Sequence, residues 1–198
     1  MIQFTKDIAS QLPYDRKQYR AYFDEDDNTF DRNTSWHAVS LQQEEIRDEK
    51  LYQVSPEVVK NCVAKLEKGF NKMITQLDHG LPWIINHDDK DLAWFNKEDT
   101  TIPKMREFFT QNKIPISSTG CLIFATTDLH DFARELITYP YVLSYNNLDI
   151  SHSKLQFIMK VTGHLTLDFL STDQALLTGI LNDDVFEGFL KIPYRRRM

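Results

Sequence analysis

The chain has 198 residues, a formal net charge of −6, and 41% hydrophobic and 26% charged residues. That length suits a single domain over residues 1–198, and a core of this size folds without a disulfide or a metal. The acidic balance disfavours nucleic acid as a partner. No apolar run approaches the ~18 residues that span a membrane, and the first residues lack the apolar stretch of a signal peptide. We therefore expect a cytoplasmic protein without a membrane partner.

Residues 1–54 mix aromatic and acidic side chains without a clear period. Their aromatic content is too high for a disordered tail, because such tails bury little apolar surface. We therefore expect an appended segment, made of a short helix and loops, that packs against the main body of the domain.

The strongest helical pattern of the chain begins after Ser55. Ser55 is a favourable N-cap, Pro56 suits the first helical position, and Gly80 is a candidate left-handed C-cap. Between them, apolar residues recur at spacings of three and four. This stripe consists of Val59, Cys62, Val63, Leu66, Phe70, Met73, Ile74 and Leu77. A helix of this length measures about 35 Å, which makes it the main helix of the domain.

The next stretch predicts a connector and a second helix. Residues 81–100 are rich in aspartate and broken by Pro82, which is typical of a polar connector. The helix is expected from near Thr101 to Asn112, because Pro103 would lie in its first turn and apolar residues follow it.

The middle of the chain predicts strands around a third helix. Residues 121–126 form a short apolar run bounded by turn residues, which indicates a central strand. A helix that begins at Thr127 or Asp128 follows, and Pro140 should end it. Residues 141–145 and 148–150 are then expected to be further strands.

The clearest strand signal is the hairpin Leu155–Leu170. Apolar and polar residues alternate on both sides of Gly163, so that one face turns to the core. The expected register places Val161 opposite Leu165 across a three-residue loop, with Gly163 at positive φ. Lys160 would then lie near Thr166 and Asp168 on the outer, solvated face.

The end of the chain completes the pattern. Asp173 and the two residues before it cap a last helix over 174–181, and the tail adds an edge strand before a solvated end at 195–197. Helices thus come first and most strands later. This order predicts an α+β fold, in which a mainly antiparallel sheet from the C-terminal half packs against the long helix and shorter helices.

One short motif resembles a catalytic signature. His164-Leu165-Thr166-Leu167 is similar to the H-x-T-x motif of the two-histidine phosphoesterases, the family that includes 2′–5′ RNA ligase-like proteins. The resemblance implies that His164 acts as a general acid or base and that the Thr166 hydroxyl contacts a phosphate. The family places two such pairs across a groove. Neither His152 nor His37 begins a second pair with this spacing.

Other candidate sites lack part of the required residue set. The acidic run at 24–28 offers calcium ligands, but Thr29 stands where the loop needs glycine and Ser35 where it needs glutamate. The histidines and aspartates of 79–91 crowd one loop, whereas a His–Asp metal hydrolase takes its ligands from separate elements.

Cys62 and Cys121 form no CxxC pair, so we expect buried, reduced thiols. No nucleotide-binding motif occurs, and we expect neither a metal nor a cofactor.

The sequence therefore favours a small acidic protein that binds another protein. The sharpest version is an immunity or antitoxin-type partner of a basic toxin or nuclease. Exposed aromatics such as Trp94 or Phe95 would anchor the interface. The expected partner-binding residues are Asp24, Glu25, Asp26, Asp27, Asp88 and Asp89. Two alternatives stay open: a divergent phosphoesterase centred on His164 and Thr166, and a structural or adaptor subunit, which would show an apolar surface patch.

Overall fold

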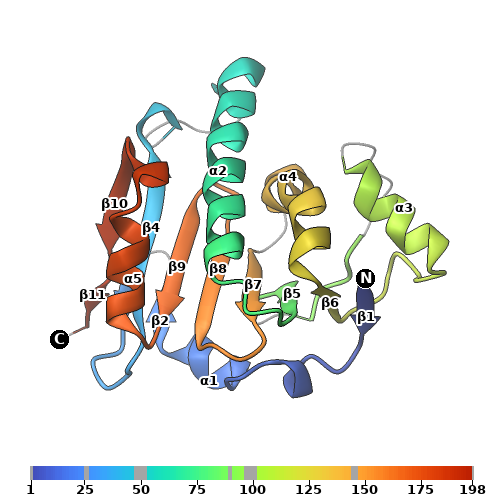
Figure 1. Ribbon diagram of the computed structural model, residues 1–198, viewed down its shortest axis with the longest axis horizontal. Coiled ribbons are helices and arrows are strands. Elements are labelled where there is room, and N and C mark those ends of the chain that lie inside the picture. The colour runs from blue at the N-terminus through green and yellow to red at the C-terminus, as the bar shows by residue number, and fades with distance from the viewer. Residues whose placement is uncertain are drawn as a thin grey trace.

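An eight-stranded antiparallel sheet forms the centre of the computed structural model (Figure 1). The structure describes residues 2–24, 27–46, 53–88, 91–95, 102–143 and 147–197. The strands follow the order β1-β6-β5-β7-β8-β9-β4-β10 across the sheet. Their bounds are β1 Gln3–Thr5, β4 His37–Gln43, β5 Trp83–His87, β6 Cys121–Phe124, β7 Leu148–His152, β8 Phe157–Val161, β9 Leu167–Ser171 and β10 Phe189–Pro193.

Helices α2 to α5 pack on one face of this sheet (Figure 1). Their bounds are α2 Pro56–Gln76, α3 Pro103–Gln111, α4 Thr126–Leu143 and α5 Gln174–Leu181. Apolar side chains of the helices and of the strands form one core between the two layers, as with the fully buried Phe70 of α2 and Leu136 of α4. The predicted α+β fold with an antiparallel sheet is confirmed. However, β1, β4 and β5 come from the first half of the chain.

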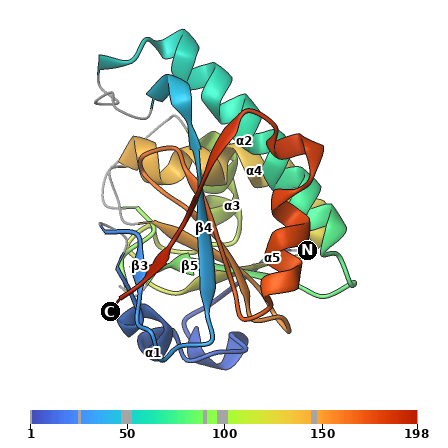
Figure 2. The ribbon, with the colours of Figure 1, turned by 90° about the vertical axis from the view of Figure 1, so that its left-hand side faces the viewer.

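The N-terminal segment covers the opposite face of the sheet (Figures 1 and 2). It contains helix α1 (Arg16–Ala21) and the short strands β2 (Phe23–Asp24) and β3 (Thr29–Phe30), which form a small second sheet with β11 (Arg195–Arg196). Its aromatic residues pack on strands β4, β8 and β9. This cluster consists of Tyr19, Phe23, Phe30, Trp36, Ala38, Ile158 and Leu170. The expected helix is present, but the expectation of helix and loops alone was wrong, since the segment also supplies β1 and β4.

Helices with clear capping residues begin where the sequence predicts. The Ser55 side chain accepts a hydrogen bond from the backbone N–H three residues later (3.3 Å), and Asp173 does the same for α5 (3.0 Å). Helix α2 ends at its C-cap Leu77, so Gly80 is not the cap; it lies in the following turn with φ 68°. The predicted edge strand is also confirmed, because β10 pairs with β4 at the border of the sheet.

Strand β5 lies where a polar connector was expected. All five of its residues are buried, and it pairs with both β6 and β7 near the middle of the sheet. The aspartates that follow it gave the stretch a polar average, and the proline before it indicated a break, so a strand of only five residues was not recognised. Part of the remaining connector, residues 89–90 and 96–100, lies outside the described residues.

Helix α4 continues through Pro140 to Leu143. The predicted strand over 141–145 was therefore wrong for residues 141–143; residues 144 and 145 are outside the described part of the chain. Proline removes a single hydrogen bond to the preceding turn. The buried side chains of Leu136, Tyr139 and Leu143 keep this last turn against the core.

The hairpin of β8 and β9 has the predicted faces but a different register. Val161 pairs with Leu167, two positions further along than expected, and the loop has five residues, 162–166. A shift of two residues keeps every side chain on its face. The positive φ in this loop belongs to Leu165 (55°), and a hydrogen bond between the hydroxyls of Thr162 and Thr166 (2.8 Å) closes it.

Gly120, just before β6, is a position where a side chain does not fit. Its φ is 150°, and an added Cβ would collide with the carbonyl oxygen of Thr5 on β1. We expect Gly120→Ala to lower the free energy of unfolding by about 2 kcal/mol or more, measured by urea unfolding. Gly179 in α5 is the matched control, because nothing lies within 4 Å of its added Cβ. Gly179→Ala should stabilise by about 0.5–1 kcal/mol; equal losses in both variants would contradict the collision.

Candidate functional site

The acidic segment expected to bind a partner lies beside basic residues. Asp27 is exposed and its N–H donates to the Asp24 carboxylate (3.4 Å). Strand β11 runs parallel to β3 next to this segment, and its two residues are arginines. Glu25 and Asp26 lie outside the described residues, as does Asp89. A role of Asp24 and Asp27 in partner binding stays a prediction, with opposite charge close to them.

Three of the residues expected at the interface are buried. Asp88 is 3% exposed and its carboxylate lies 3.8 Å from the Lys160 ammonium. Trp94 and Phe95 are 0% and 1% exposed, and the Trp94 indole N–H donates to the carbonyl of Gly120 (3.1 Å). The expectation of exposed aromatic anchors was therefore wrong. Asp88 belongs to a buried charge cluster instead of an exposed acidic surface.

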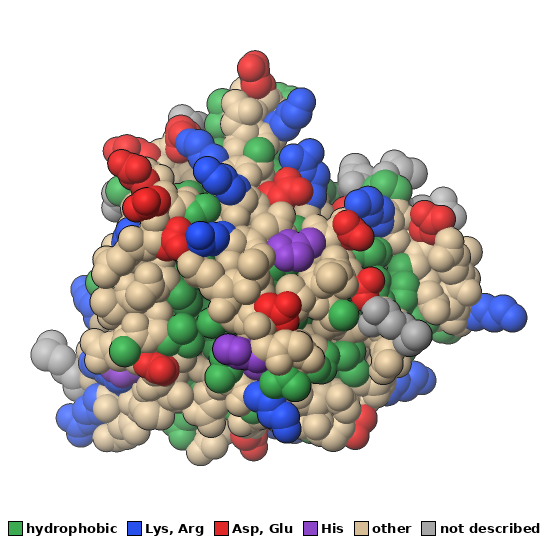
Figure 3. Space-filling view, in the orientation of Figure 1, with side chains coloured by type: hydrophobic (Ala, Val, Ile, Leu, Met, Phe, Trp, Pro, Cys, Tyr) green, Lys and Arg blue, Asp and Glu red, His purple; other side chains and the backbone are tan. Residues whose placement is uncertain are grey.

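The helical face of the molecule carries charges of both signs. Figure 3 shows acidic and basic side chains interspersed around α2 and α4, without a large patch of one sign. Ion pairs account for part of this pattern, as between Arg134 and Glu67 (2.9 Å). Charge alone therefore gives this face no preference for a basic partner.

His164 and Thr166 lie in the loop of the β8–β9 hairpin. His164 is exposed, and the Thr166 hydroxyl is used in the hydrogen bond that closes the loop. His37 and Phe157 both pair with Ser171, at the far end of the same strands. His152 ends β7 at that far end too. The structure thus does not bring His164 together with the second histidine that the phosphoesterase arrangement requires.

A row of polar side chains crosses the face of the sheet that the N-terminal segment covers. Each member is the direct cross-strand neighbour of the next. All are at most 3% exposed. From β5 to β4, this polar row consists of Asn86, Asp149, Lys160, Asp168 and Ser40. The sequence placed Lys160 near Asp168, but in a different register and on a solvated face. Alternation within a hairpin carries no information about a covering segment far away in the chain.

Contacts with the N-terminal segment and the C-terminal tail cover the polar row. The Lys160 ammonium lies 2.7 Å from Asp149 and 5.4 Å from the ring centre of Phe23. The Tyr194 hydroxyl donates to Asp168 (2.9 Å). Tyr14 of the N-terminal segment is affected by the same row. Its burial, and then the negative charge of Asp149, raise the pKa of Tyr14 well above its ordinary value. The row therefore joins the layers of the fold and offers no open binding surface.

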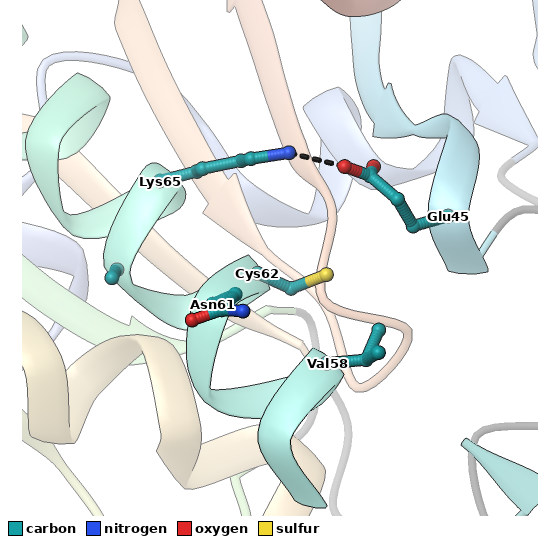
Figure 4. Close-up of a pocket in the computed structure, with 6 residues that line it drawn as sticks. Glu45, Val58, Asn61, Cys62 and Lys65 are labelled. Carbon is teal, nitrogen blue, oxygen red and sulfur yellow. Dashed lines mark hydrogen bonds and ion pairs between the residues drawn. The ribbon is translucent and has the colours of Figure 1, made fainter. Parts of the chain in front are cut away.

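A small hollow beside α2 contains one of the two thiols. It has a volume of about 400 Å³, and Figure 4 shows the Cys62 sulfur between Val58 and the ion pair of Glu45 with Lys65. Burial and the charge of Glu45 raise the pKa of Cys62, and burial raises that of Cys121 to about 12. Both thiols are buried and reduced, as predicted. Protonated thiols are poor nucleophiles, so neither residue has the character of a reactive cysteine.

A larger hollow opens between β1, the turn after α2 and the start of α4. Its volume is about 540 Å³. Asp78 is the one charged side chain among the residues that line it, and we call it the Asp78 hollow. The lining consists of Gln3, Gln11, Asp78, Gly80, Leu81, Pro82, Ile123, Phe124, Ala125, Thr126 and Thr127.

The Asp78 carboxylate is exposed and held in its ionised form. It accepts a hydrogen bond from the Gly80 N–H (2.9 Å). That bond, the Thr126 side chain and the nearby histidines His79 and His130 lower the pKa of Asp78. The hollow thus combines a permanent negative charge with an apolar wall.

His152 lies behind the wall of this hollow. The N–H of the next residue, Ser153, donates to the carbonyl of Pro82 (3.1 Å), which lines the hollow. The His152 ring is fully buried, with its centre 5.3 Å from that of Trp83 and 5.8 Å from that of His79. Burial, and then the charge of His79, lower the pKa of His152.

Metal ligation has no support in the described residues. They contain no group of three or more histidine, cysteine, aspartate or glutamate side chains that could hold an ion. His79 and His87, which the sequence placed in one loop, lie apart: His79 is exposed, whereas the buried ring of His87 hydrogen-bonds the Tyr139 hydroxyl (3.0 Å). No helix in the described ranges is long and apolar enough to cross a membrane.

The comparisons with known proteins give no relative for this chain: no family model, no curated protein and no solved structure matches it. Sequence reasoning missed the Asp78 hollow because its lining comes from three distant segments, 3–11, 78–82 and 123–127. The local signal was an aspartate just after a helix, followed by Gly80 and Pro82.

Proposed function

We propose that this chain binds a basic segment of another protein, and that the Asp78 hollow receives an arginine or lysine side chain of that segment. The observation that carries the proposal is the lining, in which one carboxylate stands beside an apolar wall that includes Leu81, Ile123 and Phe124. Arginine and lysine have an apolar stem and a cationic tip, so they match both parts. The net charge of −6 would favour the approach of a basic partner.

Arginine should fit better than lysine. The Asp78 Oδ1 atom accepts the Gly80 N–H, but a carboxylate has about four acceptor positions and retains room for a guanidinium. A guanidinium can bond both oxygens in one plane, which an ammonium cannot. The amides of Gln3 and Gln11 supply further acceptors in the lining.

Within this proposal, a basic toxin or nuclease is the partner class for which an acidic immunity-type protein is suited. Asp24 and Asp27 remain predicted contacts of the same partner. The geometry favours neither alternative. His164 has no second histidine beside it, and in the described residues Ile116 is the large hydrophobic side chain that is exposed, at 43%, which is a single residue and not an apolar patch.

Binding of N-acetylargininamide, followed by NMR amide shifts of the full chain, tests the hollow directly. We expect weak, saturable shifts in residues 78–82 and 123–127, and no binding of N-acetylcitrullinamide, which is the neutral isostere. Asp78→Asn should lower the affinity about tenfold or more, because a charge-assisted pair becomes a neutral one. Asp27→Asn is the control and should bind the arginine probe as wild type does, because Asp27 is a predicted contact of the whole partner and does not line the hollow.

Two results would contradict the proposal: equal affinity for the arginine and citrulline probes, or an Asp78→Asn variant that binds as tightly as wild type. Loss of binding in Asp27→Asn alone would move the site to the acidic segment. The same two variants can then be compared in a pull-down from cell lysate at low and moderate salt, where a basic partner should dissociate as salt increases.

A further inference from the structure

The side chain of His152 fixes a turn through one of its ring nitrogens. The Nδ1 atom accepts hydrogen bonds from the backbone N–H groups of Lys154 and Leu155, both at 3.1 Å. A ring nitrogen that accepts a hydrogen bond carries no proton, so the neutral ring carries its proton on Nε2. The Nε2 atom is buried and has no hydrogen-bond partner among the described residues.

A second proton on this ring would disrupt the turn. It would have to bind Nδ1, where it would point at two N–H groups that are donors themselves. Both hydrogen bonds of the turn would be lost, and a charge would be added to a ring that is 0% exposed. The protonated form of His152 is therefore incompatible with the observed turn.

The groups that face His152 do not compensate for such a charge. The turn after α2 presents His79, which is itself basic, and Asp78, whose carboxylate is solvated at the hollow. Strand β5 contributes the uncharged Trp83 ring, and the turn itself contributes the basic Lys154, which is exposed. The burial of the ring and the charge of His79 outweigh Asp78, so the pKa of His152 is lowered.

We propose that His152 is a proton-sensitive latch on the turn 152–155 and, through it, on the Asp78 hollow. When the ring is protonated, Lys154 and Leu155 lose their acceptor and the turn opens. Ser153 then no longer holds the carbonyl of Pro82, which lines the hollow. The effect on ligand binding rests on the proposed function, whereas the opening of the turn does not.

The latch can be tested by NMR on the full chain between about pH 7.5 and pH 4.5, a range that contains the ordinary pKa of histidine. At neutral pH the His152 ring should carry its proton on Nε2. On acidification, the amide signals of Lys154 and Leu155 should move together, with one midpoint below 6.5. The affinity for N-acetylargininamide should fall about fivefold or more over the same step.

His152→Asn separates protonation from structure. The Asn Oδ1 atom takes the place of Nδ1 and can accept the same two N–H groups, but it does not titrate in this range. The amides of Lys154 and Leu155 should then keep their positions down to acid pH. His164→Asn, at an exposed loop, is the matched control and should leave the wild-type titration unchanged.

Each outcome decides a separate point. Amides that titrate in wild type but not in His152→Asn support the latch, even if the arginine probe binds at no pH, a result that contradicts only the proposed function. Amides that move identically in His152→Asn and wild type overturn the latch. A neutral ring with its proton on Nδ1 also overturns it, because Nδ1 could then accept neither hydrogen bond.

Discussion

Asp149→Asn is expected to lower the free energy of unfolding by about 3–5 kcal/mol in urea unfolding at neutral pH. Asp149 and Lys160 are both 0% exposed and their charged atoms lie 2.7 Å apart. The variant keeps the shape of the side chain but leaves the ammonium of Lys160 buried, with the carboxylate of Asp88 further away at 3.8 Å. Removing one partner of a buried pair costs more than the pair contributes, because the other charge stays away from water.

An ion pair with one exposed partner provides the comparison. Arg16 and Asp91 are also 2.7 Å apart, but the Asp91 side chain is 63% exposed. Asp91→Asn should change the stability by less than about 1 kcal/mol. A loss in Asp149→Asn no larger than in Asp91→Asn would contradict the role of the polar row.

Acid should destabilise the protein through His87. Burial lowers the pKa of this histidine to about 4, against an ordinary value near 6.5. Between these values the unfolded chain binds a proton that the folded chain does not, so stability is fully present above pH 6.5 and falls as the pH falls towards 4. The difference corresponds to about 3 kcal/mol.

The measurement is the free energy of unfolding from denaturant curves at several pH values between about 7 and 4. His87→Gln should show a shallower loss over this window, since the titrating group is gone. His164→Gln, at the exposed hairpin loop, should keep the wild-type slope. If both variants have the same slope as wild type, another group carries the acid sensitivity.

Local patterns in the sequence determined which elements could be predicted. Helices α2 and α5 have their capping residues and apolar stripes within the segment itself, so their starts could be located. Strand β5 could not, because its burial depends on β6 and β7 on either side of it. The same reason explains the error at Lys160, since the layer that buries it comes from residues 14–36 and from the tail.

The candidate site was harder to predict than the fold. Asp78 follows α2 in an ordinary turn, and nothing near it in the sequence indicates that β1 and the start of α4 complete a hollow around it. The acidic residues that did stand out, such as Asp88, were judged by charge, although burial decides whether a charge is available. Aromatic residues gave the same error, because Trp94 and Phe95 fill the core.

The position of β4 in the sheet has a consequence for how the protein is made. This strand, residues 37–43, pairs with β9 at 167–171 and with β10 at 189–193. More than 120 further residues have to be synthesised before either neighbour exists, which takes on the order of 10 s at typical translation rates. During that time its backbone N–H and C=O groups have no partner strand. The nascent chain would be most prone to aggregation in this interval, and chaperones would act on it then.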